Sequence, residues 1–95
     1  MNKSELDIDS AKKLVHEISQ NLAALPESSA KYAQLRTEVE DLKAMLDRAD
    51  PHAPMIEDKM KSVQALFDRA AVELRADGIR VGIFLAEIGR ILGLD

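Results

Sequence analysis

The sequence contains no cysteine, and aromatic residues make up only 3% of it. Without cysteine, a disulfide framework, a thiolate metal site and cysteine-based catalysis are all excluded. Only Tyr32, Phe67 and Phe84 carry aromatic rings, so a core must be built from leucine, isoleucine, valine, alanine and methionine. This palette is typical of helical proteins.

The chain also lacks any block of like charges. Its 17 acidic and 13 basic residues give a net charge of −4. Nucleic-acid-binding proteins usually carry a basic stripe that faces the phosphates, and none is visible here, so we expect no nucleic-acid partner. Opposite charges instead recur at i,i+4 spacing, which makes them neighbours on a helix and predicts a self-paired, solvated surface. The predicted pairs are Lys13–Glu17, Arg36–Glu40, Glu57–Lys61 and Arg69–Glu73.

The opening segment MNKSELDIDS has no apolar run of the kind found in secretory signals. We therefore expect a cytoplasmic protein. Ninety-five residues correspond to one domain, 1–95, whose folding buries roughly two-thirds of the surface exposed by the unfolded chain. Stability is expected to be marginal or shared with a partner.

Apolar residues recur in alternating steps of three and four along most of the chain. This spacing places them on one face of a helix, and no strand-like alternation of useful length is present. Residues 8–25, 29–49, 54–76 and 79–93 are the predicted helices.

Residues suited to ending helices stand near these boundaries. Asp7 or Asp9 can cap the first helix, and Ser28 or Ser29 the second, because short polar side chains accept hydrogen bonds from free amides. Gly78 suits the left-handed position after the third.

The predicted fold is an all-α, antiparallel helical bundle of three long helices and a shorter C-terminal one. The short PESS segment between the first two favours an antiparallel hairpin, and the sustained seven-residue spacing favours left-handed, coiled-coil-like packing. A monomeric four-helix bundle and a dimer of helical hairpins both satisfy this pattern.

The last predicted helix has more than two faces. At about 100° per residue, a bulky face is followed by a face of small residues. The candidate packing residues are Gly82, Ala86, Gly89 and Gly93 on the small face, with Phe84 and Ile88 on the bulky one. A mid-helix glycine costs about 1 kcal/mol relative to alanine, so the small face predicts a close approach of a second helix, within the chain or from another copy.

A simpler interpretation of these glycines stays open. Gly93 then ends the helix, Gly82 lies in a frayed first turn and Gly89 has no special role. A spanning membrane helix is not expected, since the segment is short and carries Arg80, Glu87 and Arg90.

Residues able to perform catalysis are sparse. His16 and His52 are the only histidines, and neither has a second metal ligand at helical spacing. The serines lack a nearby general base, no glycine-rich phosphate loop occurs, and the carboxylates are spread along solvated faces. We expect no catalytic, cofactor-binding or metal-binding residues, no cofactor and no enzymatic activity.

The segment LVHEISQNLAAL, followed by a second predicted helix and then by LFDRAAVELRADGIRVGIFLAEIGRILGLD, resembles short bacterial all-helical proteins of unknown function, which end in a helix closing on a leucine-glycine pair. The resemblance covers most of the chain. In that family a His-Pro pair interrupts the last helical region, whereas no such pair follows residue 54 here. It implies a small, self-associating helical protein and transfers no site residue.

Together these features predict a helical interaction or structural module that self-associates through helix packing, most simply as a homodimer. A further protein partner is compatible with this role. The alternative is a peripheral membrane or adaptor protein that uses the apolar segment 79–94 as an anchor or partner-binding surface.

Overall fold

The computed structural model describes residues 6–25 and 32–93. Within these residues it contains helices and no strand, which confirms the all-α class. The helices are α1 (Ile8–Ala23), α2 (Ala33–Leu46), α3 (Ala53–Arg69), α4 (Ala71–Ala76) and α5 (Val81–Leu92).

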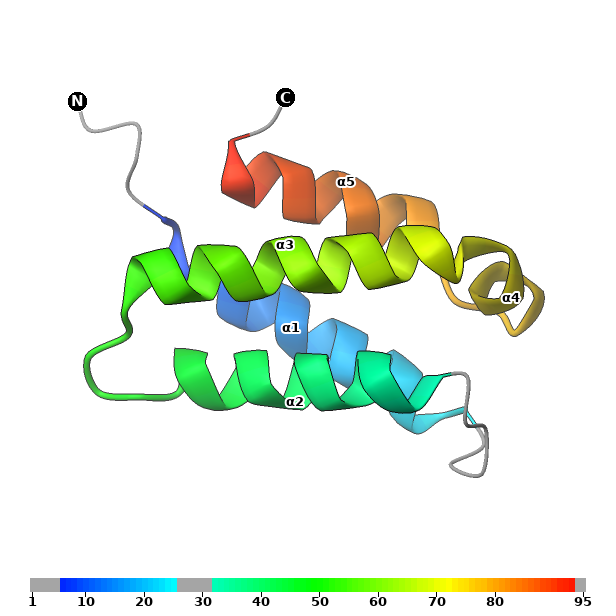
Figure 1. Cartoon of the computed structure of the whole chain (residues 1–95), viewed down its shortest axis with the longest axis horizontal. Helices are drawn as coiled ribbons and strands as arrows, with labels where there is room; N and C mark the ends of the chain where they lie inside the picture. Colours follow the sequence, from blue (N-terminus) through cyan, green and yellow to red (C-terminus); the bar gives the residue numbers. More distant parts are fainter. Residues whose placement is uncertain (1–5, 26–31, 94–95) are drawn as a thin grey trace.

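The four longer helices lie along the long dimension of the molecule, and the chain reverses direction from each to the next (Figure 1). Contacts join α1 to α2, α2 to α3, α3 to α5 and α5 back to α1. These contacts form a closed ring, so the core lies between the four helices.

Helix α1 begins where the sequence places one of its two candidate caps. The Asp7 carboxylate accepts hydrogen bonds from the Ser10 amide at 3.1 Å and from the Ser10 hydroxyl at 2.8 Å. These bonds hold the pKa of Asp7 below its usual value. The helix ends at Ala23 rather than at residue 25, because the Leu25 amide turns to the Leu22 carbonyl at 3.1 Å. A single cap residue therefore sets the start of α1.

Helix α2 is shorter than predicted. It runs from Ala33 to Leu46, and its N-cap position is Tyr32. Ser28 and Ser29, the expected caps, lie outside the described residues.

The prediction of one continuous helix over 54–76 is wrong. The helix is interrupted at Ala70, whose backbone angles are φ −100° and ψ 17°, and α4 then departs from the α3 axis (Figure 1). Leu74 on α4 is fully buried, so the bend places an apolar side chain in the core at the end of the bundle. Gly78 then takes the predicted left-handed conformation, with φ +91°.

Most of the apolar residues that recur in steps of three and four, here called the apolar stripes, are buried in the core. The exceptions are Ile8 and Ala70, which are half-buried, and Ala49, which is exposed. Between α3 and α5, the rings of Phe67 and Phe84 pack with centroids 5.9 Å apart and a 53° tilt. The stripe residues that are buried are Ala11, Val15, Ile18, Leu22, Leu25, Tyr32, Leu35, Val39, Leu42, Leu46, Ile56, Met60, Val63, Phe67 and Leu74.

The predicted i,i+4 charge pairs are not what the structure shows. Lys13–Glu17, Glu57–Lys61 and Arg69–Glu73 form no ion pair among the described residues. Arg36 reaches across to α1 and donates to the Leu22 and Leu25 carbonyls, at 3.4 and 3.0 Å. The physical reason is that exposed i,i+4 pairs gain little energy, so they need not form, and Arg36 instead bonds to two carbonyls of the preceding segment.

Candidate interaction surface

Helix α5 turns its bulky face into the core. Phe84 and Ile88 are 3% and 1% exposed, and both belong to the main apolar cluster. These two candidate packing residues therefore hold α5 against its own chain, through contacts of α5 with α1 and α3.

The four small residues of α5 are not gathered into one contact surface. Gly89 is buried, whereas Gly82 and Ala86 are exposed. Gly93 has φ +75° and occupies the left-handed C-cap of α5. Apart from its chain neighbours and the local backbone of its own helix, a Cβ added at Gly82 would meet no atom of the described chain within 4 Å. The small residues thus divide into a core position, a cap and two exposed positions.

Ile83 lies between the two exposed small residues in sequence and is 54% exposed. We call Gly82, Ile83 and Ala86 the α5 outer face. Beside it, the Arg90 guanidinium pairs with Glu87 at 2.8 Å, which gives the face a charged margin. Ile83 was not among the packing residues predicted from the sequence, although its position beside the charged residues Arg80, Glu87 and Arg90 on the helix was a signal.

A second surface feature lies between α2 and α3. We call it the α2–α3 groove, an open hollow of about 530 Å³. It is lined by Glu38, Asp41, Ala44, Met45, Met55, Asp58, Lys59 and Ser62.

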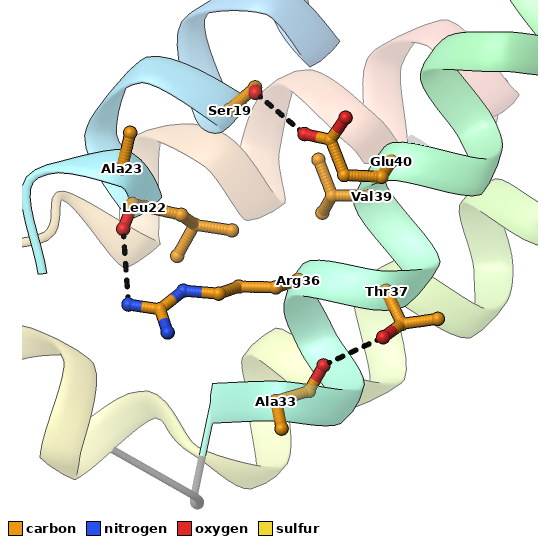
Figure 2. Close-up of a pocket in the computed structure, with 8 residues that line it drawn as sticks. All are labelled: Ser19, Leu22, Ala23, Ala33, Arg36, Thr37, Val39 and Glu40. Atoms are coloured by element: carbon orange, nitrogen blue, oxygen red, sulfur yellow. Dashed lines mark hydrogen bonds between the residues drawn. The ribbon is translucent and has the colours of Figure 1, made fainter. Parts of the chain in front are cut away.

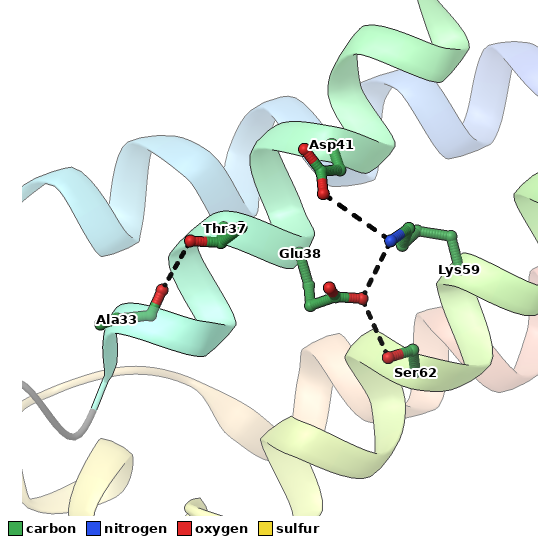
Figure 3. Close-up of polar contacts among 6 residues, drawn as sticks. All are labelled: Ala33, Thr37, Glu38, Asp41, Lys59 and Ser62. Carbon is green, nitrogen blue, oxygen red and sulfur yellow. Dashed lines mark hydrogen bonds and ion pairs between the residues drawn. The ribbon is translucent and has the colours of Figure 1, made fainter.

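An ionic cluster occupies one end of this groove (Figure 3). The Lys59 ammonium lies 3.2 Å from Glu38 Oε1 and 3.7 Å from Asp41 Oδ2. The Ser62 hydroxyl donates to the same Glu38 oxygen at 3.0 Å. The hydrogen bonds from Lys59 and Ser62 lower the pKa of Glu38, because both stabilise its charged form.

A hollow of about 430 Å³ lies between α1 and α2 (Figure 2). Its polar side chains bond across the two helices: the Ser19 hydroxyl donates to Glu40 at 3.0 Å, and Arg36 donates to the Leu22 carbonyl. These bonds tie the hairpin together.

The histidines lie apart from each other. His16 is exposed on α1, in a shallow hollow with Lys12 and Lys43, and His52 is the exposed N-cap residue of α3. In the part of the chain that the structure describes, no three His, Cys, Asp or Glu side chains are grouped to hold a metal ion. The same part contains no helix that combines the length and apolarity required to cross a bilayer.

Comparisons with protein-family models, with curated proteins and with solved structures returned no match to this chain.

Proposed function

We propose that this protein is a small helical interaction module that self-associates as a homodimer through the α5 outer face. The observation that carries the proposal is the exposure of Ile83, a large apolar side chain, between two exposed small residues, Gly82 and Ala86.

The chemistry of this face suits a crossing of two helices. Side chains at the crossing set the distance between helix axes, so Gly82 and Ala86 would permit a close approach of the two backbones. Full burial of an isoleucine side chain contributes roughly 1.5–3 kcal/mol, and a two-fold axis would bury Ile83 twice. The Arg90–Glu87 pair would then lie at the polar rim.

Within each subunit, we propose an antiparallel four-helix bundle with coiled-coil-like packing. The closed ring of contacts among α1, α2, α3 and α5 supports the bundle. The alternating three-and-four spacing of the buried residues supports knobs-into-holes packing. We propose that the protein has a binding role, without catalytic activity or a cofactor. The exposed apolar surface at Ile83 supports the binding role.

The alternative of a membrane anchor formed by residues 79–94 is less well supported. Phe84, Ile88 and Ile91 are buried in the core, so α5 would have to leave the bundle before its bulky face met a lipid surface. Only Ile83 presents a large, mainly exposed apolar side chain among the described α5 residues.

The mass of the protein in solution tests the proposal. Light scattering after gel filtration is expected to give about twice the chain mass of 10.5 kDa. Ile83→Glu and Ala86→Glu are each expected to give a folded monomer, because a carboxylate at either position would be desolvated in the dimer. Ala33→Glu is the matched control, since Ala33 is exposed on α2, a helix that makes no contact with α5.

A monomer at every concentration from about 1 to 500 μM would contradict self-association, since a specific helical dimer is expected to have a dissociation constant within or below that range. A dimer that survives both α5 substitutions would place the interface elsewhere.

A further inference from the structure

The α2–α3 groove has two chemically different ends. Since α2 and α3 run in opposite directions (Figure 1), Glu38 lies across from Ser62 and bonds to it at 3.0 Å. Met45 follows Glu38 by seven residues on α2, and Met55 precedes Ser62 by seven residues on α3. The two methionines therefore mark the other end of the groove. At 1.5 Å per residue the groove is about 10 Å long, which matches two turns of a helix.

The apolar end of the groove is open to solvent. Met55 is 54% exposed, and Met45 is half-buried and packed against the core. Methionine side chains are flexible and polarisable, so they adapt to the aliphatic side chains of a partner. This end is therefore suited to receive one apolar side chain.

From its middle to the Glu38 end, the groove carries excess negative charge. Glu38, Asp41 and Asp58 face one cation, Lys59, so the lining residues sum to −2 (three carboxylates and one ammonium). Lys59 is already engaged by Glu38 and Asp41. Asp58 is exposed and forms no ion pair within the described chain, and the Asp41 side chain is 56% exposed. Two carboxylates can thus meet a cation from outside.

We propose that the α2–α3 groove binds a basic amphipathic helix of a partner protein. An apolar side chain of that helix packs against Met45 and Met55, and a lysine or arginine one to two turns away pairs with Asp41 and Asp58. The negative lining favours a basic partner over an acidic one, and an apolar stripe with flanking cations is a recurring way for a helix to occupy a groove. This binding does not depend on the α5 outer face.

A synthetic helix provides the probe. We would use a fluorescein-labelled peptide with leucines on one helical face and lysines beside them, and measure its anisotropy with the full chain. A matched peptide with glutamates in place of the lysines is the control. The lysine peptide is expected to bind at least about tenfold tighter than the control, and less tightly when sodium chloride is raised from about 50 to 500 mM.

Substitutions in the groove locate the site. Asp58→Asn is expected to weaken binding about threefold through loss of one partly screened ion pair. Met55→Ser is expected to weaken it about tenfold through loss of apolar contact. Asp68→Asn on α3 and Val72→Ser on α4 are the matched controls, because both positions are exposed and neither lines the groove. The controls should bind as the natural chain does.

Three results would overturn the proposal: no binding of the lysine peptide at low salt, equal binding of both peptides, or equal losses in groove variants and controls. Amide chemical shifts that move on α5 instead of α2 and α3 would do the same. The measurement is repeated with Ile83→Glu. Binding that persists in a monomeric form of that variant separates this proposal from the proposed self-association.

Discussion

The Tyr32 side chain is the clearest case of a single residue whose role depends on a distant contact. Its ring is fully buried, and its hydroxyl donates to Asp77, 45 residues away, at 2.5 Å. The pKa of Tyr32 is raised to about 12. Burial is the largest cause, and the hydrogen bond to Asp77 and the negative charges of Asp77 and Glu73 act in the same direction. The neutral phenol is therefore the form that the folded state prefers.

This shift predicts a loss of stability in alkali. The pKa of Tyr32 is raised above the unfolded value of 10.0, so the stabilisation is present below pH 10 and is lost as the pH rises toward about 12. The loss should be on the order of 2–3 kcal/mol. In urea unfolding followed by circular dichroism, Tyr32→Phe should be less stable by about 1 kcal/mol at pH 8.

The difference between the two proteins should shrink or reverse at high pH, because phenylalanine has no proton to lose. A constant difference from pH 8 to 12 would contradict the prediction.

Glycines show why a residue type alone leaves a role open. Gly82, Gly89 and Gly93 lie at helical spacing in the sequence, yet they are exposed, buried and left-handed at a C-cap, respectively. The sequence allows both a packing face and a cap, and the backbone conformation at Gly93, with φ +75°, is that of a cap. Which of the remaining two faces the core depends on how α5 is rotated against α1 and α3.

At the scale of elements, the pairing of α2 with α3 combines an apolar seam with the Glu38–Lys59–Ser62 cluster. The Glu38 and Lys59 side chains are 20% and 25% exposed, so their interaction is partly shielded from water and stronger than that of a fully exposed pair.

A double-mutant cycle measures this interaction. Glu38→Gln, Lys59→Met and the double variant should give a coupling free energy of about 0.5–1 kcal/mol at pH 7. Because the pKa of Glu38 is lowered below its ordinary value of 4.5, the contribution is present above pH 4.5 and is lost as the pH falls through the folded-state pKa. Urea unfolding at pH 7 measures the coupling free energy, and the same measurement at pH 3 shows its expected loss.

In the control cycle, Glu40→Gln replaces Glu38→Gln, and its coupling to Lys59→Met should be absent. Glu40 instead accepts a hydrogen bond from Ser19 on α1. Equal coupling at both positions would show that the measured energy is a general charge effect.

The break between α3 and α4 could not be predicted from the apolar spacing. The apolar spacing continues through Ala70 to Leu74, and it predicted one helix because it persists across the bend. Leu74 is buried and keeps the three-and-four spacing, so periodicity alone could not reveal the change of direction at Ala70.

For the whole molecule, stability depends on the apolar core between the helices. Phe67 is completely buried and packs against Phe84, which joins α3 to α5. Phe67→Ala should destabilise the protein by about 3–5 kcal/mol, a large share of the roughly 5–15 kcal/mol typical of natural domains. Thermal unfolding followed at 222 nm should show a much lower transition temperature, or no folded baseline.

Val72→Ala is the control for this substitution, because Val72 is 76% exposed. It should leave the transition within about 4 °C, as surface substitutions usually change stability by less than about 0.5 kcal/mol. A Phe67→Ala variant as stable as this control would mean that the α3–α5 contact contributes little.

The sequence by itself determined the all-α class, the approximate positions of the helices, a cap at Asp7 or Asp9, the left-handed Gly78 and the buried face of each longer helix. These properties follow from local backbone preferences and from the spacing of apolar residues, which act within a few turns of the chain. Only the tertiary structure decided the partners of Arg36, Tyr32 and Lys59, the bend at Ala70 and the outward position of Ile83. Those outcomes depend on distances and orientations between helices, which local spacing does not specify, because one apolar stripe can pack against its neighbours in several rotations.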